Sequence, residues 1–406
     1  MKILFIADVS LENPTSGSEQ VLYQQGKGSA VAGMDVYAIT RQEGLPCLSI
    51  RNVVGVTEGV FGASAQAVLT SVLALARYPS KLYTCFTMDI PFRAVVSHQP
   101  FNCFVLLLTG KLKNAPILYV FHSPSHEEYL LSHEHGGSLR AFPHIFARRM
   151  IERFCLKKAR RIMVLSEYMK RKVTAIHQIP AERIVVNPGG VDLSQYKPLK
   201  DRQRVKRDLE FPADRIHLLS VRNLDPRMGL DNLLKCIRIL KMNGIDVHLI
   251  LGGEGPERHD LQALILELGL SQDVTMTGFI ETDMLPLYYG ASDFFVLPTR
   301  CLEGFGLVTP ESMACGTPVL GTPVGGTREI LSGFDSGFLF RDSSPEAMAH
   351  GIETAIGEYI GYDKKYNDLR FRCREYVARN YSWQRHTNQL KSILNEILVD
   401  QEAHLH

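Results

Sequence analysis

Two glutamates, Glu303 and Glu311, bracket the stretch of this sequence that is best suited to bind a small ligand. Between them lies Gly-Phe-Gly-Leu-Val-Thr-Pro, which follows the apolar run at residues 294–297. This pattern is typical of a turn from a strand into a helix, because glycine lets the backbone approach a ligand closely and proline suits a first helical turn. The start of such a helix offers free N–H groups that favour a phosphate. We therefore expect both carboxylates to contact one elongated, phosphate-bearing ligand.

Two other segments place polar side chains where a predicted strand ends. Residues 220–229 carry Arg222 and Arg227 ahead of a helical pattern, and His122 follows the apolar run that ends at Phe121. Arginine is suited to bind phosphate, and histidine can donate a hydrogen bond or move a proton near neutral pH. Because ligands of parallel α/β sheets bind at the carboxyl ends of the strands, these residues are candidates for the same function. A solvated arginine at 227 and a structural histidine at 122 are the plain alternatives.

The elements that must position these residues alternate between strands and helices in both halves of the chain. Runs typical of strands lie at 2–7, 36–40, 116–121, 161–165 and 183–186, and again at 216–221, 247–251, 274–277, 294–297, 318–320 and 337–340. Amphipathic patterns typical of helices separate most of them. This rhythm predicts an α/β fold with two parallel sheets covered by helices. Residues 187–203 mix turn formers with charges and form the expected linker.

The segment from Glu303 to Glu311, continued by Ser-Met-Ala-Cys-Gly-Thr-Pro-Val-Leu-Gly, resembles the signature of family 4 retaining glycosyltransferases. The resemblance extends through almost all of the second half and through patches of the first. It implies the GT-B fold, in which two Rossmann-like domains with parallel sheets face each other across a cleft. Residues 1–195 would form the acceptor domain, with helix 382–400 packing back on it. Residues 196–381 would form the nucleotide-sugar donor domain.

The resemblance also implies roles for single residues. Glu303 would lie beside the donor sugar at the reacting carbon, and Glu311 would accept hydrogen bonds from the ribose hydroxyls. His122 and Arg222 join Glu303 as expected catalytic residues. The implied donor-binding residues are Gly17, Arg222, Arg227, Gly278, Phe279, Phe305, Gly306, Leu307, Val308 and Glu311.

Two positions depart from the family pattern. The family has a lysine where this chain has Met228, and the neighbouring Arg227 could supply the missing positive charge to the leaving diphosphate. The family also has two glycines in the loop after the first strand, of which this chain keeps Gly17. A plain helix N-cap formed by Ser18 explains that second segment equally well.

The expected reaction moves a hexose from a nucleoside-diphosphate sugar to an acceptor hydroxyl with retained anomeric configuration. UDP-glucose or a similar UDP-hexose is the first expectation for the donor, and GDP-mannose the second. A glycan or lipid-linked acceptor in polysaccharide or glycolipid biosynthesis is implied by the family. A sugar-nucleotide-binding protein without catalysis is the alternative of another class, supported by Met228 and opposed by the intact Glu303 and Glu311.

Motifs of other enzyme classes are missing from the sequence. No G-x-G-x-x-G follows the first strand, and no G-x-x-x-x-G-K-[ST] occurs, which argues against a dinucleotide oxidoreductase and a P-loop ATPase. There is no D-x-D pair for a metal clamp, and the histidines at 122, 126, 133 and 135 lack matching cysteines or an acidic signature. We expect metal-independent transfer, no bound metal and no cofactor.

Charge and cysteine placement indicate where the protein works. The eight cysteines are scattered, with none close enough to another for a C-x-x-C motif, which favours a reducing cytoplasm. Residues 1–200 carry 23 Lys and Arg against 14 Asp and Glu, and 11 of those basic residues lie in 140–172. This segment suits the anionic inner face of a membrane, while an ordinary amphipathic helix against the sheet explains it equally well. Nucleic acid is not an expected partner.

Overall fold

The computed structural model describes residues 1–9, 16–41, 48–52, 60–61, 92–108, 110, 112, 115–131 and 142–405. The chain divides into two compact units. Unit 1 comprises Met1–Gly189 and Trp383–His406, and unit 2 comprises Gly190–Ser382. The units therefore divide inside the stretch expected as a linker.

Unit 1 contains one sheet with the strand order β4-β3-β2-β1-β5-β6-β7-β8. Its strands are β1 (Lys2–Ile6), β2 (Asp35–Arg41), β3 (Leu48–Asn52), β4 (Val60–Phe61), β5 (Ala94–Ser97), β6 (Ile117–Phe121), β7 (Arg161–Val164) and β8 (Ile184–Val186). Neighbouring strands run parallel except at the edge, where β3 is antiparallel to both β2 and β4. The helices are α1 (Gly17–Val31), α4 (Pro100–Leu108), α5 (Ser125–Leu131), α6 (Phe142–Lys158), α7 (Glu167–His177) and α16 (Trp383–Leu405), with a short 3-10 turn at Ala181–Arg183.

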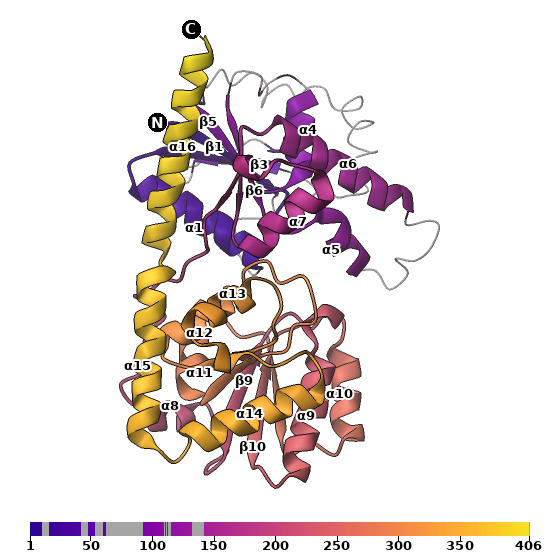
Figure 1. Cartoon of the computed structure of the whole chain (residues 1–406), viewed down its shortest axis with the longest axis vertical. Coiled ribbons are helices and arrows are strands. Elements are labelled where there is room, and N and C mark those ends of the chain that lie inside the picture. The colour runs from indigo at the N-terminus through magenta and orange to yellow at the C-terminus, as the bar shows by residue number, and fades with distance from the viewer. Residues whose placement is uncertain are drawn as a thin grey trace. The chain divides into compact units, whose positions relative to one another are not determined.

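The core of unit 1 joins the two ends of the chain. Strand β1 is buried on both faces from Ile3 onward, as its unbroken apolar run predicts. Four aliphatic side chains of α16 pack into the same core: Leu390, Ile393, Leu394 and Ile397. Their spacing puts them on one side of the helix, and Figure 1 shows α16 lying alongside α1. The C-terminal helix is thus an integral part of unit 1.

Unit 2 contains a second, fully parallel sheet with the strand order β11-β10-β9-β12-β13. Its strands are β9 (Ile216–Val221), β10 (Val247–Gly252), β11 (Val274–Gly278), β12 (Phe294–Leu297) and β13 (Val319–Gly321). The helices are α8 (Arg202–Asp208), α9 (Leu230–Met242), α10 (Arg258–Glu267), α11 (Leu285–Ala291), α12 (Val308–Ala314), α13 (Gly325–Phe334), α14 (Pro345–Tyr359) and α15 (Asp363–Asn380), with 3-10 turns at Pro226–Met228 and Ser336–Phe338.

The strand predicted at 337–340 is wrong. Asp335 accepts a hydrogen bond from the backbone N–H of Gly337 at 2.9 Å, which fixes a 3-10 turn at Ser336–Phe338. An isolated bridge between Gly321 and Leu339 joins this stretch to the sheet. Its apolar residues are buried by the turn rather than by strand pairing.

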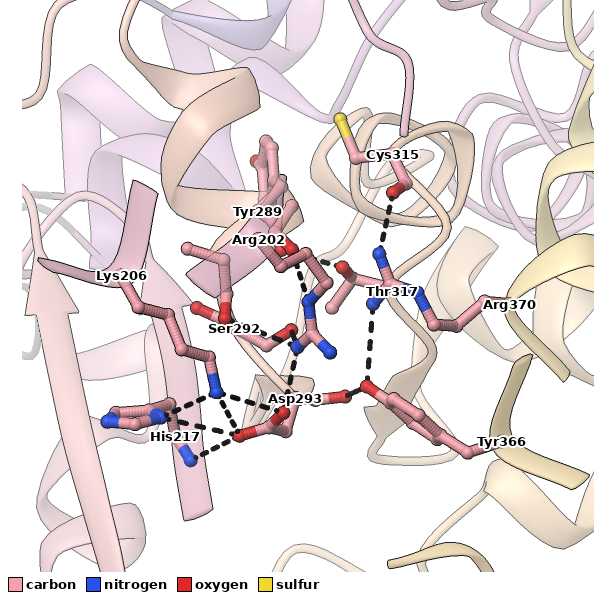
Figure 2. Close-up of polar contacts among 12 residues, drawn as sticks. Arg202, Lys206, His217, Tyr289, Ser292, Asp293, Cys315, Thr317, Tyr366 and Arg370 are labelled. Carbon is pink, nitrogen blue, oxygen red and sulfur yellow. Dashed lines mark hydrogen bonds and ion pairs between the residues drawn. The ribbon is translucent and has the colours of Figure 1, made fainter. Parts of the chain in front are cut away.

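A cluster of charged groups fastens the helices of unit 2 to the amino ends of its central strands (Figure 2). Asp293, just before β12, lies 2.8 Å from Arg202 Nη2 and 3.1 Å from Lys206 Nζ, both on α8, and accepts the backbone N–H of His217 at 2.8 Å. The Tyr366 hydroxyl of α15 donates to the Asp293 carbonyl at 2.6 Å. Burial alone would raise the pKa of the Asp293 carboxyl, but its contacts with His217, Arg202 and Lys206 hold this pKa well below its usual range. The carboxyl ends of the same parallel strands lie at the opposite edge of the sheet.

The order of the strands marks that opposite edge in unit 2. Strands β9 and β12 are neighbours although β10 and β11 come between them in the chain. The connections leave these two strands in opposite directions, which opens a crevice at their carboxyl ends. The first residues after β9 and β12 therefore meet at the place where a doubly wound sheet binds its ligand.

Candidate active site

A buried ion pair occupies the carboxyl ends of the two central strands of unit 2. Arg222 directly follows β9, and Glu303 lies in the loop after β12. Arg222 Nη2 donates to Glu303 Oε2 at 2.6 Å, and the residues are only 9% and 7% exposed. The Thr299 hydroxyl donates to the same oxygen at 3.1 Å. A pair so well shielded from water is held in one geometry, which a positioned catalytic group requires.

The loop that carries Glu303 depends on glycines from another element. Gly325, the first residue of α13, has φ +59°, and a Cβ there would lie 2.0 Å from the carbonyl oxygen of Glu303. The backbone N–H of Gly326 donates to that same oxygen at 3.0 Å. Leu302 adopts a left-handed φ of +55°, a strained conformation of the kind that gathers at functional sites. This glycine pair supports the backbone of Glu303.

Met228 packs against the guanidinium of Arg222. Its sulfur lies 2.8 Å from Arg222 Nη2, and the side chain is buried. Behind Arg222, Gly253 has φ +130°, and a Cβ there would lie 1.8 Å from the Arg222 carbonyl oxygen. The residue in place of the family lysine is therefore part of the packing that positions Arg222.

Arg227 is tied to the loop that holds Glu303. Its Nη1 donates to the carbonyl of Leu302 at 3.0 Å, and its Nε lies 3.8 Å from Asp225 Oδ1. The backbone N–H of Arg300 donates to the Arg227 carbonyl at 2.8 Å. These bonds hold the positive charge of Arg227 next to the residue that precedes Glu303.

Glu311 lies on α12 with its carboxylate hydrogen-bonded to a neighbouring helix. The Tyr289 hydroxyl of α11 donates to Glu311 Oε2 at 3.1 Å. Burial raises the pKa of Glu311 to about 7, and the hydrogen bond from Tyr289 lowers it only in part. The other oxygen of this carboxylate is the one suited to accept a hydroxyl of a ligand. Tyr289 was not identified from the sequence, since the contact joins two helices.

The raised pKa of Glu311 predicts a pH-dependent stability. The folded protein binds the proton of this carboxyl up to about pH 7, whereas an unfolded glutamate loses it near pH 4.3. Ionisation of the buried group therefore destabilises the folded state as pH rises between these values, with the full effect above pH 7. Glu311→Gln should raise the free energy of unfolding by roughly 1–3 kcal/mol at pH 8 and leave it almost unchanged at pH 4.

Urea unfolding of both proteins at the two pH values measures this difference. Glu353→Gln, an exposed change on α14, is the matched control and should shift neither value. An equal effect of Glu311→Gln at pH 4 and pH 8 would show that ionisation of the Glu311 carboxyl does not destabilise the folded protein.

The remaining predicted donor residues also lie at the carboxyl edge of the unit 2 sheet. Gly278 ends β11 with φ +74°, and its carbonyl accepts the N–H of Gly253 at 2.7 Å, while Phe279 beside it is exposed. Phe305 is buried with its ring 5.8 Å from that of Tyr381. Gly306, at φ +80°, is followed by Leu307, the N-cap of α12, and by Val308, its first residue.

His122 and Gly17 belong to unit 1. His122 follows β6, and its Nε2 lies 3.0 Å from Nδ1 of His98, which follows β5. Burial and the charge of His386 lower the pKa of His122 to about 4, so it is neutral at pH 7 and suited to hydrogen bonding rather than to carrying charge. Gly17 begins α1, whose N-cap is Ser16 and not Ser18. His98 was missed because the four-residue strand before it was not predicted.

Among the described residues, no three His, Cys, Asp or Glu side chains lie close enough together to hold a metal ion. The histidines at 133 and 135 lie outside the described residues. Within the same residues, no helix is both long and apolar enough to cross a membrane.

Comparisons with known proteins cover both units. The family model "Glycosyltransferase Family 4" matches residues 15–195, and "Glycosyl transferases group 1" matches residues 201–376. The chain is 27% identical over 51% of its length to the GDP-mannose-dependent alpha-(1-6)-phosphatidylinositol monomannoside mannosyltransferase of Mycolicibacterium smegmatis, of which 55% is covered. It is 30% identical over 63% of its length to the D-inositol 3-phosphate glycosyltransferase of Mycolicibacterium gilvum, of which 56% is covered. The matches thus span just over half of these relatives.

Solved structures match over nearly the whole chain. Sucrose-phosphate synthase from Thermosynechococcus elongatus superposes with a TM-score of 0.76 at 20% identity, covering 98% of this chain and 99% of that one. Anabaena HepE in complex with UDP-glucose superposes with a TM-score of 0.72 at 18% identity, covering 98% and 100%. With two family models that together account for most of its length and a fold shared across both units, the chain belongs to the family 4 glycosyltransferases and has the GT-B fold.

Proposed function

We propose that this protein transfers a hexose from a nucleoside-diphosphate sugar to a hydroxyl of a glycan or lipid-linked acceptor, with retention of the anomeric configuration. The observation that carries the proposal is the buried Arg222–Glu303 pair at the strand ends of unit 2, where a doubly wound sheet binds its ligand. UDP-glucose or a similar UDP-hexose is the proposed donor, since solved complexes of HepE hold UDP and UDP-glucose. GDP-mannose is the second candidate, because several relatives are named as GDP-mannose-dependent.

Arg222 is suited to stabilise the leaving diphosphate. Arginine has five N–H donors, so Arg222 can keep its bond to Glu303 through Nη2 and offer other donors to phosphate oxygens. The diphosphate gains negative charge as the bond from the sugar carbon to its oxygen breaks, and a fixed cation in a buried site stabilises that change. The acceptor oxygen then bonds to the sugar carbon from the same face. Its proton passes to the departing phosphate oxygen.

The carboxylates act on the other parts of the donor. Glu303 would lie beside the reacting carbon, where its negative charge stabilises the positive charge that develops on the sugar. Glu311 would accept ribose hydroxyls, and the backbone at residues 305–308 would bind the sugar and diphosphate. Gly278 and Phe279 would contact the base, and His122 of unit 1 would hydrogen-bond the sugar. No metal or cofactor is part of this proposal.

Arg227 would supply the charge that the family lysine provides elsewhere. Arg227→Gln should lower kcat by about 10- to 100-fold, because one of the cations near the leaving group is lost. Arg238→Gln, which removes an exposed charge from α9, is the matched control and should leave kcat unchanged. Steady-state rates with saturating donor measure the effect. An unchanged kcat in Arg227→Gln would mean that Arg222 acts without Arg227.

Donor turnover tests the proposed function and separates it from a binding protein without catalysis. The protein is incubated with UDP-glucose or GDP-mannose and a panel of glycan and lipid-linked acceptors, and release of UDP or GDP is followed. We expect release with one donor and an α-linked product, identified by the coupling of its anomeric proton. Donor binding without release would favour the binding protein, and a β-linked product would contradict retention.

We further propose that the segment 140–172 lies on an anionic membrane surface, which would bring the enzyme to a lipid-linked acceptor. Phe142, Phe146 and Met150 recur every four residues on α6 and are 67%, 57% and 46% exposed. An exposed apolar row on a basic helix is typical of an interfacial helix. Phe146→Ser should lower sedimentation with phosphatidylglycerol-containing vesicles several-fold, and phosphatidylcholine vesicles should bind neither protein. Equal binding of the variant would exclude this row as the contact.

A further inference from the structure

Arg148 of α6 has an unusual environment at the carboxyl edge of the unit 1 sheet. Its guanidinium carbon lies 5.1 Å from the ring centre of Phe101, which begins α4, and 4.7 Å from that of Tyr129 on α5. Cations are attracted to aromatic faces at such distances. The two rings restrict the side chain, so the charge is held in place before any ligand arrives.

No carboxylate among the described residues forms an ion pair with Arg148, although three acidic residues lie close enough to affect its pKa. Each of these has other partners. Asp8 accepts the backbone N–H groups of Phe101 and Asn102 at 3.0 and 2.9 Å. Glu152 accepts the backbone N–H of Ser125 at 3.3 Å. The third, Glu128, accepts the hydroxyl of Ser123.

Most donors of Arg148 are therefore available. Among the described residues, Arg148 makes one hydrogen bond, from Nη1 to the hydroxyl oxygen of Ser125 at 3.4 Å, although it has five N–H donors. A partly buried guanidinium is expected to pair with an anion, because burial of an unpaired charge is unfavourable. Since no carboxylate of α5 or α6 bonds directly to Arg148, a ligand can supply the direct partner.

Under the proposed function, the position of Arg148 favours the acceptor as this ligand. Ser125 comes three residues after His122, in the segment that leaves β6, and Asp8 and Phe101 lie just after β1 and β5. All of them are at the carboxyl ends of unit 1 strands, where this sheet would bind a ligand. Under the proposed function, the donor occupies unit 2 and the acceptor occupies this edge of unit 1.

We propose that Arg148 binds an anionic group, a phosphate or a carboxylate, on the acceptor, and that the enzyme selects acceptors that carry such a group. This inference rests on the proposed function. The planar guanidinium matches both anions, which it can bind through two parallel hydrogen bonds. A neutral acceptor would leave the charge of Arg148 unpaired beneath it, which is how a site rejects a ligand that lacks the matching group.

Calorimetric titration of the full chain, saturated with UDP or with GDP if only GDP binds, tests the proposal. The probes are glucose, glucose 6-phosphate and glucuronate. We expect at least one anionic probe to bind about 10- to 100-fold more tightly than glucose, and Arg148→Gln to abolish this difference. The phosphate and carboxylate probes show which anion is preferred.

Arg149→Gln is the matched control, because it removes the same charge from the next residue of α6. Arg149 is exposed and donates to the carbonyl of Ile176 at 3.0 Å. The control should keep the preference for the anionic probe. Both variants should bind the nucleotide like the unchanged protein, which shows that unit 2 is intact, and should unfold at the same temperature, which shows that unit 1 is folded.

Equal binding of all three probes to the unchanged protein, or no binding of either anionic probe, overturns the role of Arg148. An equal loss in Arg149→Gln and Arg148→Gln does the same, since it would reflect only the net charge of α6. Failure of every nucleoside diphosphate to bind would instead refute the proposed function itself. The two failures are distinguished because the nucleotide is titrated before the probe.

Discussion

Glu303→Gln should lower turnover by about 10³-fold and leave the affinity for the nucleoside diphosphate within about twofold. The carboxylate of Glu303 acts on charge that exists only while the sugar is leaving, so its loss affects the transition state and not nucleotide binding. Glutamine keeps the shape and an oxygen that can still accept from Arg222 and Thr299, which are now bonded to Glu303 Oε2. Alanine would leave the buried charge of Arg222 unpaired and could unfold the protein. A loss of turnover in that variant would therefore not distinguish a catalytic role from a structural one.

Donor turnover and calorimetric titration of the nucleotide measure the two quantities separately. Glu353→Gln, on the exposed side of α14, provides the control for a lost negative charge in unit 2. A parallel fall of turnover and nucleotide affinity in Glu303→Gln would assign Glu303 to binding and remove it from the catalytic step.

Gly325→Ala should abolish turnover and lower the free energy of unfolding of unit 2 by more than about 4 kcal/mol. The new Cβ would lie 2.0 Å from the carbonyl oxygen of Glu303, a backbone atom that cannot rotate away, and φ +59° is unfavourable for alanine. The loop would have to move, and with it the hydrogen bond from Gly326 and the carboxylate of Glu303.

Gly357→Ala is the control with the opposite expected sign. Gly357 lies within α14, and an added Cβ would have no atom within 4 Å. Alanine there should stabilise the protein by about 0.5–1 kcal/mol, because it restricts the unfolded chain and favours the helix. Urea unfolding of both variants compares them. A stable, active Gly325→Ala would contradict the role given to this contact.

Much of the fold follows from local patterns in the sequence. Strands β10 and β12 are mainly apolar and buried at every residue, as expected for strands covered on both faces. All four strands from β9 to β12 were predicted within a few residues. The segment 94–108 was missed because β5 has only four residues and is followed at once by the apolar helix α4. A run that is apolar throughout carries no period by which a strand and a helix can be told apart.

Helix α13 was missed for a different reason. Two consecutive glycines at its start are poor helix formers, so the segment reads as a turn. In the structure, the backbone that packs against these positions leaves no room for a side chain. Gly325 contacts the backbone of Glu303, and the N–H of Gly326 donates to the Glu303 carbonyl. Contacts between segments far apart in the chain leave no local signal.

The same limit applies to the candidate site. Glu303, Arg222 and Glu311 could be selected because each stands in a recognisable segment at a strand end or helix start. The residues that contact them could not be selected from the sequence in this way. Thr299 and Met228 are polar and apolar neighbours of a kind found throughout the chain, and only the meeting of β9 with β12 gives them their contacts with Glu303 and Arg222.

Under the proposed function, unit 2 binds a nucleoside diphosphate through Glu311, beside the Arg222–Glu303 pair. Thermal unfolding with UDP, GDP, ADP, NAD and no ligand, without added metal, tests it most directly in the unchanged protein and in Glu311→Ala. A ligand that binds only the folded state raises the unfolding temperature. We predict a clear rise with one nucleoside diphosphate and its loss in Glu311→Ala. A rise with NAD alone would contradict the binding of a nucleoside diphosphate by unit 2. A rise that Glu311→Ala leaves intact would contradict the role of Glu311 in that binding.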